Sequence, residues 1–151
     1  MHANFFAVCS QVAETSDDPN TQVGCLFINN SNEIIAKGAN TLVAGCTNTK
    51  ERTTRPAKYS WLEHAERNAI YSAARSGVSL EGSTAYVTLM PCVDCARALI
   101  QCGANKVVVA SRPNLDDARW GSQFRLTLEM FDDVGFQYIF AAAVVNAAAK
   151  E

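Results

Sequence analysis

The chain has 151 residues, which is enough for one domain with a sizeable core. Hydrophobic residues make up 48% of it and charged residues 19%, the proportions of an ordinary globular protein. The formal net charge of −2 argues against a general nucleic-acid binder, which would carry a strong basic excess. A small anionic substrate needs only a local basic patch, and this balance allows one.

Targeting signals are absent from the sequence pattern. No segment approaches the roughly 18 apolar residues that a membrane helix requires. The first six residues lack the charged region and the long apolar run of a secretory signal. We therefore expect a cytoplasmic protein without a membrane partner. The chain has six cysteines, and in a reducing compartment the Cys-x-x-Cys spacing among them indicates metal or redox chemistry rather than disulfides.

The first part of the chain predicts a helix and then a β-hairpin. Apolar residues at positions 5, 8, 9, 12 and 13 form one helical stripe, which ends at the turn residues 17–20. The apolar runs 23–29 and 34–38 flank an Asn/Ser-rich turn and predict two paired strands. Residues 41–60 have no clear periodicity and carry four basic residues against one acid. We interpret them as a long functional loop, with a solvated or subunit-contacting insertion as the alternative.

The second part alternates helices with strands. Helices are predicted over 62–75, 92–102 and 122–133, each followed by a glycine. Strands are predicted over 84–89, 107–110 and 136–140. This alternation predicts an α/β fold, a three-layer α/β/α sandwich with helices on both faces of the sheet. We expect one domain over residues 1–140 and an alanine-rich tail over 141–151.

The strongest functional signal is the motif His64-Ala65-Glu66, followed by Pro91-Cys92-Val93-Asp94-Cys95, in which Cys92 lies 26 residues after Glu66. The pattern H-x-E…P-C-x-x-C is typical of zinc-dependent nucleobase deaminases. It supplies three zinc ligands, His64, Cys92 and Cys95, and one carboxylate that need not be a ligand. Three protein ligands leave the fourth position of a zinc ion open, which indicates a catalytic site.

These residue types suit the replacement of an exocyclic amine by oxygen. Zinc lowers the pKa of bound water to about 7, so that hydroxide becomes available. Glu66 would take the water proton, protonate the ring nitrogen and later protonate the leaving ammonia. Cys92 and Cys95 are neighbours at i and i+3 on a helix that we expect to carry Pro91 in its first turn. The N-terminus of that helix should lower the pKa of both thiols.

A Cys-x-x-Cys pair alone would equally predict redox chemistry or a structural zinc ion. Thioredoxin-like chemistry needs neither His64 nor Glu66, and a structural site would usually show a fourth Cys or His ligand. Of the remaining cysteines only Cys46, in the basic segment 41–60, is a candidate for a second metal or for reactivity.

These motifs resemble those of the cytidine deaminase superfamily, and within it the deoxycytidylate deaminase branch. Residues 18–25 resemble the branch's first-strand segment, residues 58–70 its first zinc motif and residues 86–96 its second. The residue before Pro91 is the apolar Met90, and deoxycytidylate deaminases also have an apolar residue at this position. The tRNA adenosine, guanine and riboflavin-pathway deaminases have a glutamate there instead. The resemblance implies a mixed five-stranded sheet flanked by helices, one catalytic zinc ion and a homo-oligomer, either a dimer or a hexamer.

The resemblance also implies substrate-binding residues. Asn40 stands where the family places an asparagine that bonds the sugar, and the Ala65 backbone where the family reads the base edge. Asn20 and Gln22 fall near the family's phosphate-binding loop, and Tyr59 matches an aromatic residue that walls the pocket. Turn roles for the polar residues and simple packing for Tyr59 are the alternatives.

Two stretches depart from the branch. Ala39-Asn40-Thr41 stands where the branch usually has Tyr-Asn-Gly. Residues 111–121 resemble a bacterial subgroup named by homology to cytidine and deoxycytidylate deaminases. In this stretch Arg112 or Arg119 would neutralise a phosphate through a bidentate contact, or lie on the surface. Trp120 would cover the base or anchor the last helix, and its bulk favours the anchor.

We therefore predict hydrolytic deamination of a cytosine nucleotide, dCMP + H2O to dUMP + NH3. One alternative is deamination of another small amine, such as a nucleoside, a free base, or a modified pyrimidine or purine. The alternative from another class is a non-catalytic, zinc-stabilised binding domain. The predicted partner is a small molecule rather than a nucleic-acid polymer.

Overall fold

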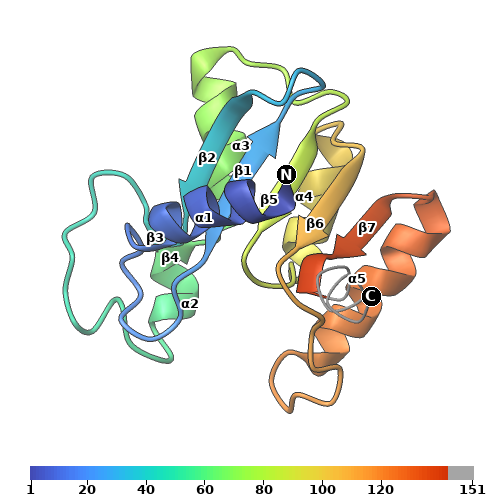
Figure 1. Cartoon of the computed structure of the whole chain (residues 1–151). Helices are drawn as coiled ribbons and strands as arrows, with labels where there is room; N and C mark the ends of the chain where they lie inside the picture. The colour runs from blue at the N-terminus through green and yellow to red at the C-terminus, as the bar shows by residue number, and fades with distance from the viewer. Residues whose placement is uncertain (143–151) are drawn as a thin grey trace.

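The computed structural model describes residues 1–142, which are built on a mixed five-stranded sheet (Figure 1). Its strand order is β2-β1-β5-β6-β7. The strands are β1 (Gly24–Ile28), β2 (Ile34–Ala39), β5 (Thr84–Val87), β6 (Lys106–Val109) and β7 (Gln137–Phe140). β1 runs antiparallel to both β2 and β5, whereas β5, β6 and β7 are parallel. The predicted hairpin and the predicted mixed sheet are both confirmed.

Helices cover both faces of this sheet (Figure 1). The helices are α1 (His2–Ala13), α3 (Ala65–Ser76), α4 (Val93–Gln101) and α5 (Gly121–Val134). Ala69, Leu99 and Phe131 bring α3, α4 and α5 into one core with β1 and β6. Cys9 of α1 packs on the opposite face, against Leu26. Both parallel crossovers proceed in the same direction along the sheet, so their right-handedness puts α4 and α5 on one face. The predicted three-layer α/β/α sandwich is confirmed.

Close packing fixes α3 against β2 at the point where the zinc motif begins. A Cβ atom on Gly38 would lie 2.4 Å from the backbone nitrogen of Ala69, so only glycine allows this approach. Asn68 donates hydrogen bonds from its Nδ2 to the Ala39 carbonyl at 2.8 Å and to Thr41 Oγ1 at 3.0 Å. The first turn of α3 is thereby tied to the end of β2.

Residues 41–64 differ from the prediction. The short strands β3 (Thr41–Leu42) and β4 (Leu62–Glu63) pair antiparallel, and α2 (Lys58–Trp61) is a short helix just before β4. The predicted single loop therefore ends in ordered elements, and the helix predicted over 62–75 begins at Ala65. A two-residue pairing across some twenty positions leaves no periodic pattern, so the sequence could not show it.

The predicted tail lies largely outside the described residues, which end at residue 142. Ala141 is buried against the α1 side of the sheet. Within residues 1–142, no helix is both long enough and apolar enough to cross a membrane. A single domain over residues 1–140 stays a prediction.

Candidate active site

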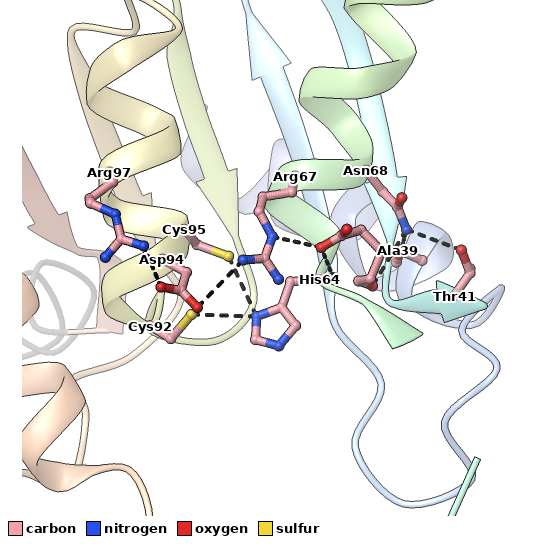
Figure 2. Close-up of polar contacts among 10 residues, drawn as sticks. Ala39, Thr41, His64, Arg67, Asn68, Cys92, Asp94, Cys95 and Arg97 are labelled. Carbon is pink, nitrogen blue, oxygen red and sulfur yellow. Dashed lines mark hydrogen bonds and ion pairs between the residues drawn. The ribbon is translucent and has the colours of Figure 1, made fainter. Parts of the chain in front are cut away.

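The three predicted zinc ligands meet at the N-termini of α3 and α4 (Figure 2). His64 is the N-cap residue of α3, Cys92 is the N-cap residue of α4, and Cys95 lies in the first turn of α4. Nδ1 of His64 lies 3.5 Å from Sγ of Cys92 and 3.4 Å from Sγ of Cys95. Bonds of about 2.0 and 2.3 Å at a tetrahedral angle separate nitrogen from sulfur by about 3.5 Å, which is the spacing that zinc requires.

The donor set also fits zinc chemically. Within residues 1–142, His64, Cys92 and Cys95 form the one group of three or more potential ligands, with donor atoms within 4.8 Å of one another. An imidazole and two thiolates are donors that zinc prefers, and three protein ligands leave one position open. Zinc held there supplies a Lewis acid that makes water an effective nucleophile near neutral pH. Cys46 belongs to no such group in the described part of the chain, so the geometry does not support a second metal site at Cys46.

The two cysteines have opposite pKa shifts. A hydrogen bond from Cys95, together with His64, lowers the pKa of Cys92 to about 4 despite its burial. The same hydrogen bond and burial raise the pKa of Cys95. These opposite shifts arise because two adjacent sulfurs retain one proton between them, so the predicted lowering of both pKa values by the helix N-terminus stays a prediction. The position predicted for Pro91 is wrong, since Cys92 has an extended backbone (ψ 171°) and α4 begins only at Val93.

Glu66 lies in the first turn of α3 with only 4% of its surface exposed. Burial raises the pKa of its carboxyl, although a backbone hydrogen bond and the charge of His64 act in the opposite direction. A carboxyl with a raised pKa exchanges protons closer to neutral pH, as a general acid–base group requires. Residues at i and i+2 diverge on a helix, so Glu66 can face a substrate while His64 holds a metal.

A cavity opens directly over these groups. It is lined by the loop before β1, the end of β2, residues 55–62, the loop after β5 and the start of α5. His64, Glu66 and Cys92 form part of the lining, and Met90 contributes an apolar wall. The cavity thus brings a metal site, a buried acid and an apolar surface into contact with one small ligand.

Comparison with known proteins agrees with this geometry. Residues 1–111 match the family described as the cytidine and deoxycytidylate deaminase zinc-binding region. The chain belongs to this deaminase family. A protein of Aliivibrio fischeri named "Uncharacterized deaminase in luxG 3'region" is 35% identical over 133 residues, 88% of either chain. Human deoxycytidylate deaminase is 36% identical over 113 residues, 71% of this chain but only 62% of the human protein.

Solved structures of deaminases share the fold. The dCMP deaminase of cyanophage S-TIM5 superposes with a TM-score of 0.72 at 24% identity, covering 92% of this chain and 95% of the phage chain. A bifunctional diaminohydroxyphosphoribosylaminopyrimidine deaminase/reductase of Thermotoga maritima gives a TM-score of 0.65 at 26% identity, covering 92% of this chain and 36% of that protein.

Four of the predicted substrate-binding residues of this deaminase line the cavity, namely Asn40, Tyr59, Ala65 and Trp120. Trp120 is the N-cap residue of α5 and packs on the core, and its ring lies edge-on to Tyr59 at 6.2 Å. It therefore both anchors the helix and walls the cavity. Asn20 and Gln22 are exposed and lie outside the lining.

The Asn40 side chain organises the loop that leads into β1. Its Oδ1 accepts the Val23 amide at 2.9 Å, and its Nδ2 donates to the Thr21 carbonyl at 2.7 Å. An amide side chain has one more N–H and one more lone pair to offer. A sugar contact from Asn40 is compatible with this geometry and stays a prediction.

Arg112 and Arg119 line a second cavity that adjoins the first. The two cavities share Arg55 and Trp120 among their lining residues. Asp117 is the one acidic residue in the outer lining, and its carboxylate already accepts two backbone amides. The outer cavity of the deaminase is therefore positively charged.

Sequence reasoning missed a buried ion pair beside the cavity. Lys58 Nζ lies 2.8 Å from Asp18 Oδ2, and the two side chains are 5% and 4% exposed. Asp18 also accepts the backbone amides of Asn20 and Thr21, so the pair ties the loop before β1 to α2. The charge of Lys58 was visible in the basic segment 41–60, but a partner 40 positions away has no local signal.

Proposed function

We propose that the protein deaminates a cytosine nucleotide, converting dCMP and water into dUMP and ammonia. The observation that carries this proposal is the buried Glu66, which lies beside the His64-Cys92-Cys95 group in a cavity that continues into an arginine-lined one. Relatives named deoxycytidylate deaminase support the choice of substrate.

The protein's own residues would carry the proton transfers. Glu66 would remove one proton from the attacking water and deliver it to the ring nitrogen. It would then take the second proton from the hydroxyl group now on the ring carbon and deliver it to the amino group, which leaves as ammonia. The Ala65 backbone, which lines the cavity between ligand and acid, faces the base edge. Tyr59 and Trp120 form aromatic walls on which a pyrimidine ring can pack.

A phosphate group would occupy the outer cavity. Arg55, Arg112 and Arg119 line it, and the planar guanidinium fork suits bidentate phosphate binding. Lys58 is less suited to this role because Asp18 already neutralises it. The Met90 wall, 4% exposed, offers no carboxylate to the amino groups of a purine or of a riboflavin precursor, which favours the cytosine substrate.

The experiment that tests the function is ammonia release by zinc-loaded protein from dCMP, CMP, deoxycytidine, cytosine, adenine and guanine. We expect kcat/KM for dCMP to exceed that for deoxycytidine at least tenfold. Arg112→Met and Arg119→Met should reduce this preference by raising KM for dCMP while leaving deoxycytidine turnover unchanged. Equal turnover of deoxycytidine and dCMP would refute the nucleotide assignment, and no turnover of any compound would favour a zinc-stabilised binding domain.

The proposal includes a cytoplasmic homo-oligomer, a dimer or a hexamer, on the basis of the family. Light scattering of the eluting protein during gel filtration gives the molar mass in solution. A mass of 16.3 kDa, that of one chain, would refute the oligomer.

A further inference from the structure

The backbone of the predicted zinc ligand His64 is bound by the carboxylate of its neighbour Glu63. Glu63 Oε1 accepts the His64 backbone amide at 3.1 Å and the Arg67 Nε–H at 2.6 Å. Glu63 and Arg67 are each 23% exposed, so the pair is partly shielded from water. The position of the His64 main chain is therefore coupled to that of the Arg67 guanidinium.

The same guanidinium reaches toward the helix that carries the other two ligands. Nη1 of Arg67 lies 3.7 Å from Oδ2 of Asp94, the residue just before Cys95 on α4. Arg97 binds the opposite oxygen of Asp94 from the solvent side, at 2.5 Å. Arg67 thus adds a second link between the start of α3 and the start of α4, beside the contacts of His64 with Cys92 and Cys95.

The placement of Arg67 makes little sense as helix stabilisation. A cation in the first turn of a helix faces the positive end of the helix dipole, which is unfavourable. Its charge is offset instead by two carboxylates, those of Glu63 at 2.6 Å and Asp94 at 3.7 Å. The cation is therefore stabilised by the zinc-ligand region, rather than by its own helix.

We propose that Arg67 is a positioning residue for the zinc ion. Arg67 holds Glu63, and with it the His64 backbone, toward Asp94. It thereby keeps the imidazole nitrogen of His64 at the distance from the two sulfurs that zinc binding requires. Groups that orient metal ligands from behind typically contribute 10–100-fold to metal affinity. The inference rests on the zinc site alone and is independent of the amine that the enzyme deaminates.

The test compares zinc affinity of the full-length wild type, Arg67→Met and Arg97→Met by competition with a chromophoric chelator. The Arg97 variant is the matched control, because it also removes an arginine that pairs with Asp94 but leaves α3 unchanged. We expect zinc binding to weaken about 10–100-fold in Arg67→Met. It should change less than about threefold in Arg97→Met, whose exposed ion pair contributes little.

Melting temperatures with and without zinc separate positioning from simple stabilisation. A merely structural Arg67 would lower both melting temperatures equally. A positioning Arg67 reduces the gain on adding zinc, because a tenfold loss of affinity removes about 1.4 kcal/mol of that gain. Zinc affinity of Arg67→Met within threefold of wild type would overturn the proposal, even if deamination were lost.

Two milder variants keep the test decisive if Arg67→Met does not fold. Arg67→Lys retains the charge but cannot reach both carboxylates with a planar fork. Glu63→Gln retains an acceptor for the His64 amide and weakens the pairing with Arg67. We expect both to bind zinc several-fold more weakly than wild type, and unchanged affinity in both would overturn the proposal.

Discussion

The buried pair of Lys58 and Asp18 gives the sharpest stability prediction. Lys58→Met keeps the apolar stem and removes the ammonium, which leaves the Asp18 carboxylate 4% exposed without its cation. Removing one partner of a buried pair costs about 3–5 kcal/mol. Two backbone amides still bind Asp18, at 2.9 and 3.1 Å, so we expect the lower end, about 3 kcal/mol.

The assay is urea unfolding followed by circular dichroism, with thermal melting as a second readout. At about 2–4 °C per kcal/mol for a domain of this size, the melting temperature should fall by roughly 6–12 °C. Arg125→Met is the matched control. Its ion pair with Asp116 has a similar length, 3.0 Å, but the side chains are 57% and 91% exposed, so the loss should stay below about 1 kcal/mol.

A double variant, Lys58→Met with Asp18→Asn, completes the cycle. It removes the unpaired charge, so it should be more stable than Lys58→Met alone by about 1 kcal/mol or more. The reasoning is refuted if Lys58→Met costs no more than Arg125→Met, because burial would then not determine the strength of this pair.

Four further predictions concern the acid–base group, the packing of α3, the metal and the pH dependence of the buried pair. Glu66→Gln should keep its zinc content by metal analysis yet lose about 10²–10⁴-fold in deamination rate, and activity within tenfold of wild type would contradict its role. Gly38→Ala should cost about 1–3 kcal/mol in urea unfolding, because a Cβ atom would press on the Ala69 backbone, whereas an unchanged midpoint would contradict that contact. Chelation should lower the melting temperature, and no shift after verified zinc removal would show that the metal does not stabilise the fold. Burial would raise the pKa of Asp18, but Lys58 and two amides lower it, so its contribution is complete above about pH 4 and is lost as the pH falls through the lowered folded value. The urea midpoint of wild type should therefore fall more steeply than that of Asp18→Asn below pH 4, and equal slopes would argue against the pair.

Local signals predicted most of the architecture. The helix and strand order followed from apolar periodicity and from glycines after the helices, because those features depend on neighbours in the chain. The largest error lies where a distant partner decides the conformation. The helix expected from residue 62 begins at Ala65 because Leu62–Glu63 pairs with Thr41–Leu42.

The grouping of His64, Cys92 and Cys95 near the buried Glu66 was predictable for a similar reason. His64 and Glu66, and Cys92 and Cys95, are short-range pairs whose spacing on a helix start already determines their relative directions. The outer parts of the site were less predictable. The cavity is lined by Asn40, Tyr59, Ala65 and Trp120. Asn20 and Gln22 do not line it, although they flank the lining residue Thr21.

The amino-acid sequence alone was sufficient to predict the order of the elements and the residues of the metal-binding group, because short fixed spacings carry that information. Which charged side chains meet depends on tertiary packing. It buries Lys58 against Asp18, brings Arg55 to the cavity shared with Arg119, and sets Arg67 between the two ligand-bearing helices. These contacts join residues that are 27 to 64 positions apart, and the packing of the whole sheet and its helices, rather than any local pattern, determines the distances between them.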